Sequence, residues 1–216
     1  MEPQLLDMAA YPRKTHFDYF RGLAYPYVGV TVPVKVTGLA RALKENGLPF
    51  FFSFLYCAAR AANGVPEFRQ RIRGEGIVQY EACRTSHTVA LEDGTFCYCT
   101  LNASMPFFEF LPYAANAQGE AKRAARATDN ADEAEELLFV SCTPWLAYTA
   151  ITQPVPMPAD SNPRITWGRF APQGEELTMP VSVLCHHALV DGLHIARFYE
   201  RLGEEMEALA AQLTRL

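Results

Sequence analysis

The last fifth of the chain is an apolar strand, a tight turn and a long helix in direct succession, and this limits the possible folds most. Residues 177–186 predict the strand, Asp191-Gly192 the turn, and the helix follows at once. Apolar residues at three-to-four spacing give that helix one stripe to pack against a core. The stripe consists of Ile195, Phe198, Leu202, Met206, Leu209 and Leu213.

The rest of the chain mixes strands and helices without a regular alternation, which favours an α+β sandwich over a doubly wound fold. Valines at every second position from Val28 to Val36 predict a strand with one buried face, and Pro33 predicts an edge or bulge there. Predicted helices cover Tyr11–Arg21, Thr37–Gly47 (capped by Thr37 and ended by Gly47), Phe50–Asn63, and Phe107–Ala127 with a break at Pro112. Predicted strands cover Gly76–Tyr80, Ser86–Leu91, Thr95–Leu101, Leu137–Ser141, Leu146–Ile151, Arg164–Phe170 and Leu177–His186.

Length and charge restrict the class of protein. A chain of 216 residues predicts a single domain, 1–216. The net charge of −5 argues against binding nucleic acid, and the basic cluster Lys122–Arg126, followed by an acidic run to Glu136, predicts a solvated helix end. No apolar run reaches the length of about 18 residues that a membrane helix needs, and the N-terminus lacks the features of an export signal. We therefore expect a cytoplasmic protein that binds no membrane.

The six cysteines predict reduced, mostly buried thiols, because no CxxC pair occurs and a cytosolic chain of this size rarely forms disulfides. Cys97 and Cys99 fall on the same face of a strand and are expected in the core. A metal site at Cys185, His186 and His187 is disfavoured, since neighbouring residues of a strand point to opposite faces and cannot converge on one ion. No metal is expected.

His187 is the strongest candidate for chemistry. A strand end fixes its backbone, and an imidazole with an ordinary pKa of about 6.5 is suited to take a proton from a hydroxyl at neutral pH. Asp191, four residues later across a tight turn, need not reach that ring, and a cation is its more natural partner. Ser141 has no GxSxG context, which argues against a serine nucleophile.

The segment HHxxxDG, here His186–Gly192 followed by Leu193–Phe198, resembles the active-site segment of chloramphenicol acetyltransferases. Five further blocks of that family occur in the same order: Arg13–Phe17, Pro66–Arg69, Thr95-Phe96, Ser141–Trp145 and Ile165–Phe170. The resemblance implies that family's two-layer α/β sandwich with a mixed sheet. It also implies a homotrimer with active sites between subunits, acetyl-coenzyme A as co-substrate, and a small-molecule hydroxyl acceptor.

The resemblance assigns a role to each matching residue. His187 would be the general base, with its tautomer held by its own backbone carbonyl, and no acyl-enzyme would form. Ser141 would stabilise the tetrahedral intermediate and Thr166 would order a water beside it. Asp191 and Arg13 would form a buried ion pair that braces the turn presenting His187.

The two substrates would contact different residues. Matching positions on the coenzyme side are Phe51, Trp145, Arg169 and Phe170, for which packing in the core is an equal alternative. Matching positions in the acceptor pocket are Tyr19, Phe20, Tyr25, Val28, Phe96, Phe139 and Gln153. This chain departs from the family mainly in that pocket, at Tyr19-Phe20, Tyr25–Val28 and Thr152–Pro154, and Tyr98 and Cys99 are bulkier than expected.

The leading hypothesis is therefore an acetyl-coenzyme A-dependent O-acetyltransferase that acetylates chloramphenicol and confers antibiotic resistance. One alternative is the same reaction on a different hydroxyl. Dihydrolipoyl acyltransferases and condensation domains share the His-x-x-x-Asp-Gly turn. The former usually follow lipoyl and linker segments, and the latter are about twice as long as this chain. An alternative of another class is a trimeric binding protein that uses the scaffold without turnover.

Overall fold

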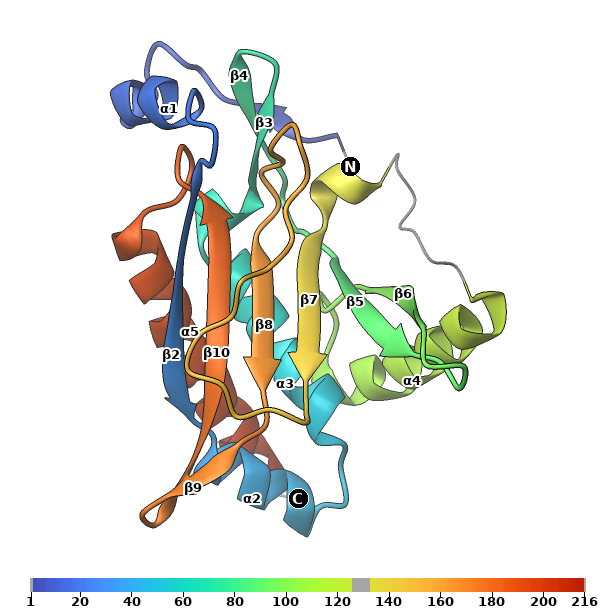
Figure 1. Cartoon of the computed structure of the whole chain (residues 1–216). Helices are drawn as coiled ribbons and strands as arrows, with labels where there is room; N and C mark the ends of the chain where they lie inside the picture. The colour runs from blue at the N-terminus through green and yellow to red at the C-terminus, as the bar shows by residue number, and fades with distance from the viewer. Residues whose placement is uncertain (1, 126–132, 216) are drawn as a thin grey trace.

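Helices cover one face of a mixed sheet, so the protein has two layers and the predicted α+β class is confirmed (Figure 1). The computed structural model describes residues 2–125 and 133–215. The large sheet has the strand order β2-β10-β8-β7-β5-β6, with β9 paired to β10. Its strands are β2 (Tyr27–Lys35), β5 (Thr85–Ala90), β6 (Phe96–Leu101), β7 (Leu138–Thr143), β8 (Arg164–Gly168), β9 (Ala171–Gln173) and β10 (Glu176–His186).

A small second sheet joins β1 (Gln4–Leu5), β4 (Gly76–Gln79) and β3 (Gln70–Arg73), of which only β4 was predicted. The helices are α1 (Lys14–Phe20), α2 (Thr37–Glu45), α3 (Phe50–Asn63), α4 (Phe107–Ala124) and α5 (Gly192–Leu213), with short 3-10 turns at Pro66–Arg69 and Ala134–Glu136. None of these described helices is long and apolar enough to cross a bilayer.

The core lies between the large sheet and the helices behind it. All six residues of the predicted stripe on α5 are buried, and α5 packs against α2 and α3. Trp167 of β8 is fully buried against Phe51 and Phe54 of α3, with ring centroids 5.6 and 4.9 Å away. Cys97 and Cys99 lie in this core, as predicted.

β2 is an edge strand that pairs only with β10, and Pro33 lies opposite Pro180, where no ladder hydrogen bond is lost. The edge was predicted correctly, and the buried valine face is confirmed in part. Val36 is buried, and Val28 and Val34 pack half-buried against the core, whereas Val30 is 42% exposed.

The segment between β7 and β8 is a long loop, so the predicted strand Leu146–Ile151 is wrong. The loop crosses in front of β8 and β10, on the face opposite the helices (Figure 1). Alternating apolar residues such as Leu146 and Tyr148 suggested a strand, but they contact the face of β8 and do not extend a ladder.

Two predicted helix features also need correction. α4 runs without a break through Pro112, because its first turns are anchored by buried Phe107, Phe110 and Ala114. Thr37 does not cap α2: its hydroxyl donates to Glu176 at 2.5 Å and accepts from Leu177 N–H at 2.8 Å, which ties α2 to β10. Gly47, at a φ of 65°, follows the end of α2 as predicted. Residues 126–132, with the end of the predicted 107–127 helix and part of the acidic run, lie outside the described residues.

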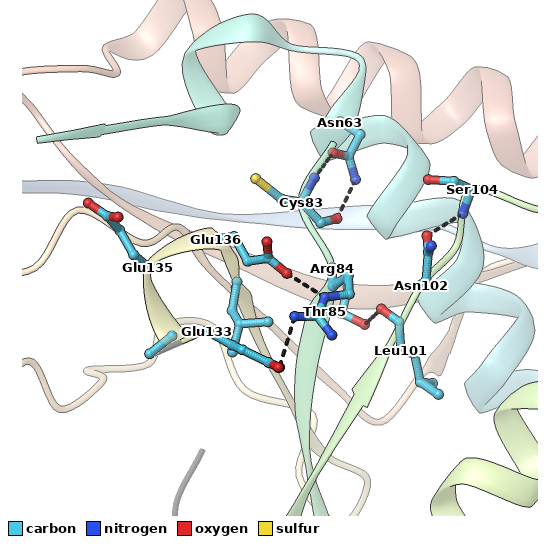
Figure 2. Close-up of polar contacts among 12 residues, drawn as sticks. Asn63, Cys83, Arg84, Thr85, Leu101, Asn102, Ser104, Glu133, Glu135 and Glu136 are labelled. Carbon is cyan, nitrogen blue, oxygen red and sulfur yellow. Dashed lines mark hydrogen bonds and ion pairs between the residues drawn. The ribbon is translucent and has the colours of Figure 1, made fainter. Parts of the chain in front are cut away.

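The start of β5 is held by polar contacts that fix where β5 can meet β7. Arg84 pairs with Glu136 and, at 2.9 Å, with Glu133 just before β7 (Figure 2). The side chain of Asn63, at the end of α3, accepts from Cys83 N–H at 2.7 Å and donates to its carbonyl at 2.9 Å. These contacts join α3, β5 and the segment entering β7 at one end of the sheet.

Candidate active site

The large sheet splits between β5 and β7, and the split holds a large cavity. Thr85–His87 of β5 pair in parallel with Leu138–Val140 of β7 and the pairing then stops, whereas β7 stays paired with β8 from Phe139 to Thr143. Beyond the paired residues, Thr88–Ala90 on one side and Ser141–Thr143 on the other line a cavity of about 1210 Å³. A cavity of this size is large enough for a small-molecule ligand.

Ser141 and Thr166 lie side by side in this cavity. They are register partners on the parallel strands β7 and β8, and both line the cavity wall. Thr166 is itself opposite Ser182, which is opposite Thr31, so four hydroxyl-bearing residues form one row across four strands. Ser182 and Thr31 share a hydrogen bond of 2.7 Å. The two residues predicted to act on a reaction intermediate are therefore adjacent.

The cavity also gathers most of the predicted substrate contacts. Its wall includes Phe51, Trp145, Arg169 and Phe170 from the expected coenzyme side, and Phe96, Phe139 and Gln153 from the expected acceptor pocket. Of the two residues that are bulkier than expected, Tyr98 lines the cavity as well, whereas Cys99 is buried in the core.

Trp145 is held at the cavity by a segment that sequence reasoning missed. The Leu146 carbonyl accepts from Arg169 N–H at 2.7 Å, and Tyr148 donates its hydroxyl hydrogen to the Thr166 carbonyl at 3.0 Å. A Cβ on Gly168 would lie 2.5 Å from that Leu146 carbonyl, so only glycine permits this close approach. One sequence offers no signal for such a packing requirement.

His187 follows the last residue of β10 and its ring is fixed on two sides. The imidazole stacks on Phe20, with ring centroids 3.9 Å apart and an interplanar angle of 25°. Nδ1 lies 2.9 Å from the Val190 carbonyl. A carbonyl can only accept, so Nδ1 carries the hydrogen in the neutral ring and Nε2 keeps its lone pair. The expected tautomer is present, but the partner is the carbonyl of Val190 and not that of His187 itself.

Arg13 and Asp191 form the ion pair that the resemblance implied. Arg13 also lies 3.4 Å from the His187 carbonyl, so it contacts both ends of the turn. Asp191 caps α5 by accepting from Leu193 N–H at 3.0 Å, and His194 accepts from Asp191 N–H at 3.0 Å. Burial raises the pKa of Asp191, but the hydrogen bond from Arg13 and nearby positive charges outweigh it, and the net pKa is lowered. The carboxylate therefore stays charged at neutral pH.

His187 and the cavity lie apart within one chain. Tyr19, Phe20, Tyr25 and Val28, the other predicted acceptor contacts, surround the His187 end of β10 and do not line the cavity. Tyr19 and Tyr25 are 66% and 55% exposed. The predicted site residues thus fall into two groups, one around His187 and one around Ser141.

The described residues of the cavity wall supply no thiolate or carboxylate that could act as a nucleophile. Burial raises the pKa of the Cys142 thiol to about 11, so it stays protonated at neutral pH. No Asp or Glu is found among the described lining residues. Across the described part of the chain, no group of three or more His, Cys, Asp or Glu residues is placed to hold a metal ion.

Solved structures share this arrangement of sheet and helices. A chloramphenicol acetyltransferase superimposes with a TM-score of 0.82 at 27% identity, covering 95% of this chain and 100% of that one. A probable dihydrolipoamide acetyltransferase from Listeria monocytogenes gives a TM-score of 0.67 at 16% identity, covering 96% and 95% of the two chains, and shows the fold alone. The fold and the cavity define an acyltransferase scaffold.

Sequence comparison then gives the family. The family model described as "Chloramphenicol acetyltransferase" matches residues 1–203, and the chain belongs to that family. A chloramphenicol acetyltransferase of Klebsiella sp is 28% identical over 202 residues, covering 92% of this chain and 91% of the relative. One from Streptomyces acrimycini is 29% identical over 212 residues, covering 97% and 94%. By class the chain is an acyltransferase.

Proposed function

We propose that this protein transfers an acetyl group from acetyl-coenzyme A to a hydroxyl of chloramphenicol, with His187 as the general base. The observation that carries the proposal is the pairing of Ser141 with Thr166 in a cavity beside Trp145 and Arg169. Relatives named chloramphenicol acetyltransferase cover nearly the whole chain and support the same reaction.

In this mechanism Nε2 of His187 accepts the proton from the acceptor hydroxyl. The oxygen then forms a bond to the thioester carbonyl carbon, and the Ser141 hydroxyl donates a hydrogen bond to the resulting oxyanion. Thr166 orders a water beside that intermediate. Collapse breaks the carbon–sulfur bond, and the imidazolium returns its proton to the coenzyme A thiolate. No acyl-enzyme forms in this mechanism, which agrees with the lack of a thiolate or carboxylate nucleophile among the described lining residues.

The proposed assembly is a homotrimer in which His187 of one copy faces the cavity of the next. In a ring of three copies each interface joins two different surfaces, so each of the two residue groups of one chain would meet the other group of a neighbour. The exposed Tyr19, Tyr25 and Val30 around the His187 end support a surface that is covered by another copy.

Two inactive variants test both the mechanism and the assembly. Ser141→Ala and His187→Asn are each expected to lose activity, measured as thiol release from acetyl-coenzyme A with chloramphenicol. When the two are co-expressed in equal amounts and assemble at random, about a quarter of all sites combine an intact His187 with an intact Ser141 of another copy. Activity should therefore return. Persistent inactivity of the mixture would place both residues of a site in the same copy.

The second candidate function is the same acetyl transfer to a different hydroxyl acceptor, and two features of the cavity lining support it. Tyr98 lines the cavity, and Arg164, held by two contacts of 2.8 Å to Asp160, adds a polar side chain to the wall next to Phe139. A panel of alcohols assayed with acetyl-coenzyme A separates the candidates. Binding of coenzyme A without turnover of any alcohol would instead favour a non-catalytic binding protein.

A further inference from the structure

The main cavity has a charge pattern opposite to that of the whole protein. The chain carries 24 acidic and 19 basic residues. The side chains with a full charge that line the described cavity are Lys122, Arg164 and Arg169, all of them cations. A lining without carboxylates in an acidic protein leaves a positive potential where a ligand enters.

Only two of these three cations are available to a ligand. Arg164 is 7% exposed and both of its terminal nitrogens donate to Asp160 at 2.8 Å, so its charge is already neutralised. Lys122 and Arg169 are exposed, and no carboxylate of a described residue lies within ion-pair distance of either. Among the described residues, both are cations on the wall of the cavity without a carboxylate partner.

Lys122 comes from a part of the fold that no substrate contact was expected to involve. It is in the last turn of α4, one turn after Gln118, which also lines the cavity. Gln118 lies 3.1 Å from the ring of buried His87, and that ring lies 5.2 Å from Phe51. These contacts connect α4 to the start of α3, so the position of the Lys122 backbone is fixed relative to the cavity.

We propose that Lys122 binds the phosphates of acetyl-coenzyme A, together with Arg169, and so determines affinity for the donor. This inference rests on the proposed function. The donor is the ligand of that reaction that carries several negative charges, at its nucleotide end. An ammonium group on a four-carbon chain can follow a phosphate at a wide cavity entrance without fixed geometry. Lys122, from the basic cluster at the end of α4, is therefore part of the site, and not only a residue of a solvated helix end.

The neighbouring arginine gives a matched control. Arg123 carries the same charge on the same helical turn but does not line the cavity. Lys122→Gln and Arg123→Gln thus remove one positive charge each at almost the same place. A general effect of net charge on association would appear in both variants, whereas a direct contact with phosphate would appear in Lys122→Gln alone.

The experiment compares two donors, acetyl-coenzyme A and S-acetylpantetheine, which lacks the nucleotide and the phosphates. Lys122→Gln should raise KM for acetyl-coenzyme A about three- to tenfold with kcat nearly unchanged, and added salt should reduce the difference. KM for S-acetylpantetheine and for chloramphenicol should stay within about twofold of the unmodified enzyme. Arg123→Gln should stay within the same limit for both donors.

Three results would overturn the inference: equal effects in the two variants, an equal effect on both donors, or an effect on the acceptor alone. Calorimetric titration with coenzyme A keeps this test separate from that of the proposed function. If the unmodified protein neither binds coenzyme A nor releases thiol, the proposed function fails and this inference with it. If it uses acetyl-coenzyme A and Lys122→Gln is neutral, only the role of Lys122 is wrong.

Discussion

The guanidinium of Arg13 pairs with the carboxylate of Asp191, 178 positions later in the chain. The pair joins the segment before α1 to the N-cap of α5, across the turn that carries His187. The Arg13 side chain is 17% exposed and the Asp191 side chain 32% exposed, so solvent screens the pair only in part.

Breaking this pair should destabilise the protein. It should affect catalysis only indirectly, through the turn that carries His187. Arg13→Met is expected to lower the free energy of unfolding by about 1–3 kcal/mol, less than for a fully buried pair because the carboxylate keeps some water. Denaturant titration measures the loss. In the double variant with Asp191→Asn the second substitution should cost less than it does alone, and full additivity of the two would contradict a direct interaction.

Replacing His187 should abolish turnover without unfolding the protein. His187→Asn removes the lone pair of Nε2, and we expect activity to fall by about 10²–10⁴ or more. The melting temperature and the circular dichroism spectrum should stay close to those of the unmodified protein, because the ring is half-buried and packs on one aromatic neighbour. His16→Asn, on exposed α1, is the matched control. Retained activity in His187→Asn would reject this residue as the base.

Gly168→Ala should disturb the cavity through the backbone. The new Cβ would lie 2.5 Å from the Leu146 carbonyl and 2.9 Å from the Tyr148 ring, so the segment carrying Trp145 must move. The expected loss of stability is about 1–3 kcal/mol, with a raised KM for acetyl-coenzyme A. Gly38→Ala, in α2 where nothing lies within 4 Å of the new Cβ, should instead be neutral or stabilising. Equal effects of both substitutions would contradict the steric reason.

His186 should make stability fall in mild acid. Burial lowers its pKa to about 4, from about 6.5 in an unfolded chain, so the folded state resists protonation. Its contribution is fully present above about pH 6.5 and is lost progressively as the pH falls towards 4, by at most about 3 kcal/mol. His186→Asn keeps an acceptor for Ala188 N–H and should flatten the dependence of unfolding free energy on pH over that range. An unchanged slope would exclude His186 as the titrating group.

The spacing of apolar residues was sufficient to predict a helix wherever one face of that helix packs against the core. The α3 boundaries, Phe50–Asn63, and the buried stripe of α5 were predicted from periodicity, because burial on one side is written into residue spacing. The same reasoning failed for Leu146–Ile151, where apolar residues lie on the sheet and not in it. It held only in part for the valines from Val28 to Val36, of which Val36 is buried but Val30, in an edge strand, is exposed.

The residues of the candidate site also divide into those that the sequence identified and those that it did not. His187, Ser141 and the Arg13–Asp191 pair were found because each belongs to a block of matching residues. Gly168, Tyr148 and Lys122 were missed or given a passive role, since their importance comes from contacts between segments distant in sequence. The Val190 carbonyl, as the partner of His187, was equally inaccessible, because it depends on the path of the backbone through the turn.

Because β5 parts from β7, the space for ligands and the His187 imidazole lie in different parts of the fold, whereas many enzymes place binding and catalytic groups on the same loops. The space for ligands is bounded by the β5–β6 hairpin, which ends at Glu92–Gly94, while the imidazole is carried by the far end of β10. Lengthening or shortening that hairpin would resize the binding space and leave the imidazole where it is. Under the proposed mechanism, such a scaffold can acquire new acceptors without rebuilding its general base.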